Sequence, residues 1–195
     1  PHLAQPLSEE ELLRTMILGD RSVIDESLRL EPGETARSAM ARFLRQSLGE
    51  RYGTDLSKWS DSEVIDTIEY HVFPNMVLFP GISLPMVYRF RPIGSDPNRT
   101  LFEILFLRPR PDRGEAPEPP DPYLVREDES YASAPGFDPS MGGVYDQDTN
   151  NLRAQQQGFR ANAAGTQILG NYQEARIRHF QHVVDKYLAR GGSPS

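Results

Sequence analysis

Hydrophobic and polar residues recur with two different periods along the chain, and the first seventy residues follow the helical one. The stretch "SEEELLRTMILG" offers Ser8 as an N-cap with Glu11 three residues later, which is a capping box, and Gly19 as a stop. The stretch "SDSEVIDTIEY" repeats the box with Ser60 and Glu63. Between them, "TARSAMARFLRQSLG" predicts a helix that ends at Gly49. We expect short helices packed on another element.

The middle of the chain changes to strand-like patterns. Residues 71–80 in "EYHVFPNMVLFPG" are β-branched and aromatic, and Pro74 inside this predicted strand implies an edge, a bulge or a break. Residues 84–93 alternate between apolar and polar positions, as in a half-buried strand. The predicted strand 100–107 follows "GSDPN", so the two form an antiparallel hairpin with a long turn.

A proline-rich, charged stretch from Pro109 to Pro122 predicts a loop or linker. The longest helix is then expected from about Thr166 to Leu188, with Tyr172, Phe180 and Tyr187 in an apolar stripe that packs on the sheet. Helices, an antiparallel sheet and a final amphipathic helix predict the α+β class.

Composition and charge exclude several classes of function. The chain has 195 residues, a net charge of -7 and no cysteine. The acidic balance argues against binding nucleic acid or an anionic membrane, and no apolar run approaches the roughly 20 residues of a membrane span. Without cysteine there is no disulfide or thiolate metal site, which fits a cytoplasmic protein. The chain begins Pro1-His2 without an initiator methionine, so we expect it to be part of something longer.

Two acids in "VYDQDTNNLRAQQQGF" are the first candidates for chemistry. Asp148 precedes an amide-rich run that is typical of a helix, so it is either an acid at a helix start or a ligand of a divalent metal. Asp146 lies on the same side if the stretch is extended, and only one of the two acids need face inward.

Histidines could complete such a site. His179 and His182 are spaced i, i+3 on the predicted last helix and, with Asp148, would make a set of two histidines and one carboxylate. The same residues also suit the basic rim of a helix C-terminus. The segment "HVFPNMVLF" is either a core strand or a pocket wall in which Asn75 supplies the polar contact.

Four separated segments resemble one known family. "YHVFPNMVLFPG", "YRFRPIGSDPNRTLFEILFLRP", "VYDQDTNNLRAQQQGFRA" and "LGNYQEARIRHFQHVVDKYL" together resemble the catalytic domain of Rieske non-haem iron ring-hydroxylating oxygenases, in their alpha (large) subunit. The resemblance extends from about Tyr70 to Leu188. It implies residues 1–69 as a helical insert of that domain, and residues 70–195 as its antiparallel sheet and C-terminal helix.

The resemblance implies a helix-grip (START/SRPBCC-like) fold around a mononuclear iron(II) held by two histidines and one aspartate. Asp148 takes the position of that aspartate, and Phe73 and Asn75 take positions that line the substrate pocket. With Met76 they are expected to bias substrate choice, because Pro74 predicts a bend that turns side chains toward a cavity. The family's paired histidines and its [2Fe–2S] Rieske cluster motif do not occur in the sequence, and the cluster needs two cysteines. Both are therefore expected upstream, outside the chain, which would be a partial domain, inactive when isolated.

The expected function is hydroxylation of an aromatic or other apolar small molecule with O2. The expected partners are a ferredoxin or reductase and further subunits of an oligomer. The alternatives are a non-catalytic helix-grip module that binds a hydrophobic ligand, and a purely structural oxygenase subunit.

Overall fold

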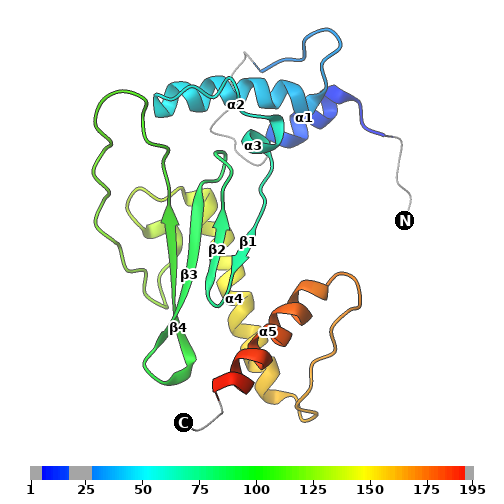
Figure 1. The fold of residues 1–195 in the computed structure, drawn as a ribbon, viewed down its shortest axis with the longest axis vertical. Coiled ribbons are helices and arrows are strands. Elements are labelled where there is room, and N and C mark those ends of the chain that lie inside the picture. Colours follow the sequence, from blue (N-terminus) through cyan, green and yellow to red (C-terminus); the bar gives the residue numbers. More distant parts are fainter. Residues whose placement is uncertain (1–5, 18–27, 192–195) are drawn as a thin grey trace. The chain divides into compact units, whose positions relative to one another are not determined.

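The structure is a computed structural model that describes residues 6–17 and 28–191. The chain divides into two compact units, residues 1–117 and 118–195, and Figure 1 shows the elements of both. Helices and a four-stranded antiparallel sheet confirm the α+β class. The division between residues 69 and 70, which separates parts of the family's domain, stays a prediction.

Three helices open the first unit: α1 (Glu9–Ile17), α2 (Ala36–Tyr52) and α3 (Asp61–Ile65). Both predicted capping boxes are confirmed, because Ser8 and Ser60 each exchange hydrogen bonds with the glutamate three residues later. The predicted end of α2 at Gly49 is wrong: the helix runs on to Tyr52 and ends at the C-cap Gly53. The predicted stop at Gly19 lies outside the described residues.

The three helices pack on one another through two small apolar clusters. Leu13 of α1 meets Ala39, Met40 and Phe43 of α2 in the first cluster. The second joins the other side of α2 to α3 and the loops, through Ala41, Leu56, Val64 and Ile82. The apolar spacing that predicted α2 therefore marks its packed face, and Ala39 and Ala41 are fully buried because alanine allows close approach.

The sheet is a meander in the order β1-β2-β3-β4, with strands at Tyr70–Val72, Met76–Phe79, Met86–Ile93 and Asp96–Phe106. Residues 71–80 are not one strand, as predicted, but a hairpin in which Val72 pairs with Met76 around a turn at residues 73–75. Pro74, which follows a cis peptide bond, lies in that turn rather than at an edge or a bulge. Proline thus ends the first strand, because it cannot donate a ladder hydrogen bond.

The hairpin between β3 and β4 is tighter than predicted. Its turn consists of Gly94 and Ser95 alone, because Ile93 pairs with Asp96. Gly94 has a φ of 61°, a left-handed value that glycine adopts without steric cost at the first position of two-residue hairpin turns. The "DPN" residues that were predicted as turn belong to β4.

The second unit holds the 3-10 turn η2 (Tyr131–Ser133), α4 (Pro139–Ala161) and α5 (Ala175–Gly191). The last helix starts later than predicted, and it is not the longest described helix. The helix begins at Ala175, since the preceding segment contains Gly165 and Gly170, and Tyr172 lies outside it, 92% exposed. The longest described helix is α4, with 23 residues. Packing of α5 on the sheet stays a prediction.

The predicted loop at residues 109–122 is confirmed, because these residues form neither helix nor strand. Across the described ranges, no helix is long and apolar enough to cross a membrane.

Candidate functional site

The helix α4 carries both acids that the sequence singled out. Asp138 caps it by accepting a hydrogen bond from the backbone N–H of Ser140 at 2.7 Å, and Pro139 takes its first position. Both residue types are favoured there. Asp148 is therefore in the middle of a long helix, and the prediction of a helix-start acid is wrong. Asp146 is helical too, so the extended backbone that would place both acids on the same side is not present.

Asp146 is fully engaged in holding a neighbouring segment. Its carboxylate accepts hydrogen bonds from the Ser130 hydroxyl at 2.5 Å and from the backbone N–H of Tyr131 at 2.9 Å. The Ser130 hydrogen bond, more than any other contact, holds the pKa of Asp146 below its ordinary value. These bonds favour the charged form, so Asp146 is a structural carboxylate.

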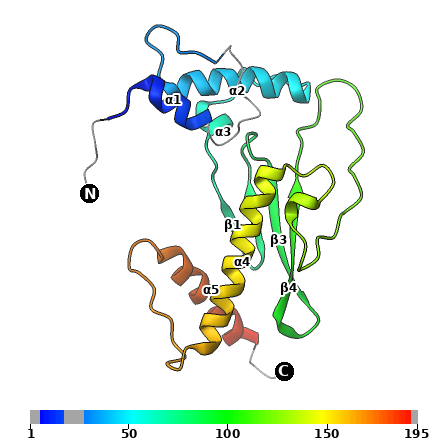
Figure 2. The same cartoon turned by 180° about the vertical axis from the view of Figure 1, so that it is seen from behind.

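Residues 127–137, which we call the strap, lie along one face of α4 (Figure 2). The rings of Tyr131 and Phe137 lie 5.6 and 5.7 Å from the ring of buried Tyr145. Further along, Arg153 donates to the backbone carbonyl of Glu127 at 2.8 Å. The strap and this face of α4 form the small core of the second unit.

Asp148 lies on a different face, which the strap leaves uncovered. Two helical residues separated by one position point about 200° apart, so Asp148 turns away from the side of Asp146. Its carboxylate is exposed and makes no hydrogen bond or ion pair with any described residue. Val144 and Leu152, one turn before and after it, and Phe159 are exposed apolar residues of the same face. The face therefore presents a single available carboxylate within an apolar stripe.

These residues do not complete an iron site. Within the ranges 6–17 and 28–191, no group of three or more histidine, aspartate or glutamate side chains is placed to hold a metal ion. The set of Asp148, His179 and His182 is therefore not assembled, and both histidines lie exposed on α5. Asp148 suits the role of one carboxylate ligand, and an iron site would need its other ligands from outside the described residues.

The three predicted pocket residues lie at the β1–β2 turn of the first unit. Asn75 is bound twice to Phe90 of β3: its side-chain amide donates to the Phe90 carbonyl at 2.7 Å, and its own carbonyl accepts from the Phe90 N–H at 2.9 Å. Phe73 is half-buried in the turn, and Met76 pairs with Arg89 at the start of β2. Asn75 thus also holds the turn against β3.

An aromatic array that the sequence analysis did not single out covers one face of the sheet. The Phe79 and Phe102 rings meet the Tyr88 ring edge-on, with centroids 4.8 and 5.2 Å away, and Phe90 stacks on Phe102 at 4.8 Å. The alternation in β3 indicated that Tyr88 and Phe90 share one face of the strand. The position of Phe102 beside them depends on the register between β3 and β4. This face offers apolar, aromatic contact surface.

The opposite face of the sheet carries a charged cluster. Both carboxylate oxygens of Glu103 accept hydrogen bonds from Arg89, at 2.6 and 2.9 Å, and from Arg91, at 2.8 and 2.9 Å. These bonds, from Arg89 first and then Arg91, lower the pKa of Glu103 to about 2. Met76 lies on this charged face, because it pairs with Arg89 across the ladder.

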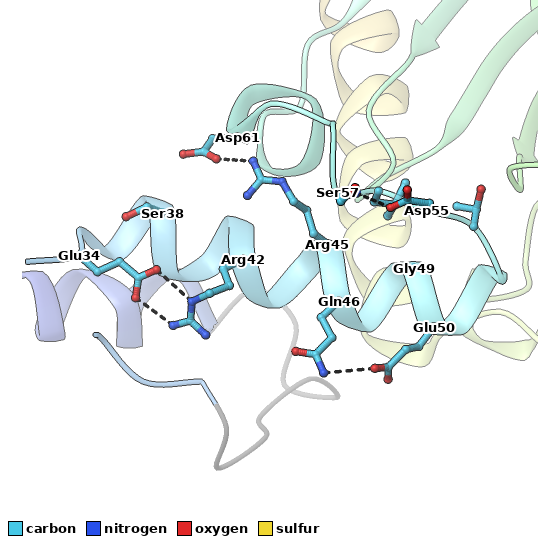
Figure 3. Close-up of a pocket in the computed structure, with 12 residues that line it drawn as sticks. Glu34, Ser38, Arg42, Arg45, Gln46, Gly49, Glu50, Asp55, Ser57 and Asp61 are labelled. Atoms are coloured by element: carbon cyan, nitrogen blue, oxygen red, sulfur yellow. Dashed lines mark hydrogen bonds and ion pairs between the residues drawn. The ribbon is translucent and has the colours of Figure 1, made fainter. Parts of the chain in front are cut away.

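A shallow groove of about 680 Å³ runs over α2 and the loop that follows it (Figure 3). Its two arginines are already paired. Arg42 binds the Glu34 carboxylate at 3.0 and 2.9 Å, and Arg45 binds Asp61 at 2.5 Å and the Trp59 carbonyl at 2.7 Å. Since these bonds occupy the cationic groups, the groove is a surface feature of the helical region rather than a candidate site.

Comparison with known proteins gives one match. Residues 28–190 match the model of the family described as ring hydroxylating alpha subunit (catalytic domain). No curated protein and no solved structure matches the chain significantly.

Proposed function

The chain belongs to the ring hydroxylating alpha subunit family, in the catalytic domain, and from this membership we propose that it forms the C-terminal part of a Rieske-type oxygenase catalytic domain. The proposed reaction is hydroxylation of an aromatic or other apolar small molecule with O2 at a mononuclear non-haem iron. The family match supports the general oxygenase role, and the finer assignment is our inference.

The contrast between the two acids on α4 carries the proposal at the level of residues. Both carboxylate oxygens of Asp146 accept hydrogen bonds from the strap. The carboxylate of Asp148 is exposed on an apolar face and remains available for a ligand. We assign Asp148 as the iron ligand of this chain. Two histidines from elsewhere in the parent protein would complete the set of two imidazoles and one carboxylate that leaves open iron positions.

The remaining parts of the proposal rest on what the family implies and on the composition of the chain. A Rieske [2Fe–2S] cluster requires two cysteines and two histidines, so with no cysteine in the sequence it would belong to another part of the parent. Electrons would come from a ferredoxin or reductase, in an oligomeric cytoplasmic assembly. Phe73, Asn75 and Met76, at the β1–β2 turn, would contact the apolar substrate.

Iron analysis of the intact parent enzyme tests the assignment. Asp148→Ala should lose mononuclear iron and hydroxylation while the visible absorbance of the Rieske cluster persists, because one anionic ligand is removed from a three-ligand set. Asp146→Ala is the matched control on the same helix and should retain iron. Equal iron content in Asp148→Ala and wild type would refute the assignment.

A non-catalytic helix-grip module that binds an apolar ligand is the second candidate. The observation in its favour is that the described residues form no metal-binding group by themselves. Anaerobic titration with iron(II) separates the two candidates. An intact parent that binds an aromatic ligand but takes up no iron at an Asp148-dependent site would favour the module.

A further inference from the structure

The charged cluster on the sheet holds more positive than negative charge. Arg89 and Arg91 share one carboxylate, that of Glu103. The four strands together carry three arginines and two acids, for a net charge of +1 in a chain of net charge -7. In the groove over α2, by contrast, Arg42 and Arg45 each bind a carboxylate of their own. The cluster on the sheet therefore keeps one cationic group in excess.

Arg91 is the cation in excess. The Nε and Nη2 groups of Arg89 donate to the two oxygens of Glu103 at 2.6 and 2.9 Å, which is a complete two-bond pairing of one guanidinium with one carboxylate. Arg91 adds a second pair of bonds to the same oxygens, and its Nη1 makes no hydrogen bond with any residue in the described ranges. Its side chain is 50% exposed. A further carboxylate can therefore bind Arg91 while Arg89 still neutralises Glu103.

Arg91 lies beside the β1–β2 turn, which carries the proposed substrate contacts. Asn75 of that turn is bound through two hydrogen bonds to Phe90, the residue before Arg91. Met76, the first residue of β2, pairs with Arg89 across the ladder. Met76 and Arg91 are therefore diagonal neighbours on one face of the sheet, with Cα atoms about 7–8 Å apart. A positive charge thus borders the surface that we propose to contact the substrate.

The same face offers apolar surface next to this charge. Val72 pairs with Met76, and Met76 pairs with Arg89, so these three side chains follow one row across the strands. Val72 is 43% exposed, and Met76 is half-buried. Leu101, which lies opposite Arg91 on β4, is half-buried as well. A ligand on this face meets apolar side chains together with a guanidinium group.

We propose that Arg91 determines substrate specificity by binding the carboxylate of an aromatic acid whose ring contacts Val72 and Met76. The proposal rests on the proposed function, since it takes the β1–β2 turn as a substrate-contacting surface. Arginine suits this ligand because its planar guanidinium binds a carboxylate through two parallel hydrogen bonds. A neutral hydrocarbon gains no such bonds. The substrate class is thereby narrowed from apolar molecules in general to aromatic carboxylates.

Ligand binding to the intact parent enzyme tests the proposal without turnover. Benzoate and nitrobenzene have nearly the same shape, but only benzoate is charged near neutral pH. Calorimetric titration should show that wild type binds benzoate about tenfold or more tightly than nitrobenzene, because hydrogen bonds to charged groups are the stronger ones. Arg91→Gln should lose this preference but keep its affinity for nitrobenzene, which also shows that the variant is folded. Arg108→Gln, in the exposed loop after β4, makes the same change in net charge and should keep the preference.

Two further variants locate the ligand. Arg91→Lys keeps the charge without the planar fork and should retain part of the preference. Met76→Ala should weaken both ligands to a similar degree, because it removes apolar contact with the ring that they share. A preference that persists in Arg91→Gln, equal affinity of wild type for both ligands, or binding of neither would overturn the proposal and leave Arg91 as a structural partner of Glu103. None of these results depends on iron, so the iron content of Asp148→Ala tests the proposed function separately.

Discussion

Asp146 and Asp148 point to different sides of α4 although a single residue separates them. Asp146 binds Ser130 and Tyr131 of the strap, and Asp148 is exposed without a partner among the described residues. The helical backbone produces this division, because each residue advances by about 100° around the axis. One acid is thereby structural, and the other is available for a ligand.

The two acids should differ in their effect on stability. Asp146→Ala leaves the Tyr131 N–H and the Ser130 hydroxyl without their acceptor, so the midpoint of thermal unfolding should fall. Asp148→Ala removes no contact among described residues and should melt close to wild type, as exposed substitutions usually do. Calorimetry of the iron-free protein measures both variants. A larger loss of stability in Asp148→Ala would contradict the division of roles.

Gly142 should tolerate no side chain. A Cβ at this position would lie 2.5 Å from the backbone nitrogen and 2.6 Å from the Cα of Ala132 in the strap. We expect Gly142→Ala to destabilise the second unit by about 1–3 kcal/mol, as overpacking does. A Cβ added to the adjacent Gly143 would instead meet open space, with no neighbouring atom within 4 Å. Gly143→Ala is therefore the matched control and should be neutral or stabilising by up to about 1 kcal/mol, through helix propensity. Urea unfolding compares the two; similar curves would argue against the strap contact.

Glu103 should make stability depend on acid pH. Its folded pKa of about 2 lies below the ordinary 4.5, so the folded state favours the charged form. Its contribution to stability is complete above about pH 4.5 and is lost as the pH falls toward 2. Glu103→Gln should flatten the fall of the unfolding free energy in this range, whereas Glu115→Gln, in an exposed loop, should not. Parallel pH profiles for wild type and Glu103→Gln would contradict the proposed role of the two arginines.

Asn75→Ala should lower the stability of the protein, in addition to its proposed effect on substrate choice. The change removes the side-chain hydrogen bond to the Phe90 carbonyl, which is worth about 0.5–1.5 kcal/mol. Denaturant unfolding checks this, and a midpoint equal to that of wild type would show that the bond contributes nothing to the turn.

Phe73→Leu should change the product profile of the intact parent enzyme, because a smaller, non-aromatic side chain alters the apolar surface offered at the turn. Chromatography of products from several aromatic substrates measures the effect. Product ratios identical to those of wild type would remove Phe73 from the proposed pocket.

The sequence by itself determined the elements whose evidence is local. Ser8 with Glu11 and Ser60 with Glu63 defined two helix starts, because a capping box is made by residues three positions apart. Alternation predicted β3, and the proline-rich stretch predicted the loop, since both depend on the conformational preferences of neighbouring residues. The family resemblance, too, rested on motifs in the sequence, and the match over residues 28–190 confirms it.

Only the tertiary structure decided the features that depend on distant partners. The start of α4 was missed because Gly142 and Gly143 are weak helix formers, yet the close approach of Ala132 requires glycine at position 142. Phe102 lies against Tyr88 because of the register between β3 and β4, which no local sequence pattern fixes. The separate roles of Asp146 and Asp148 were likewise decided by the strap, because a carboxylate becomes structural only where folding brings donors to it.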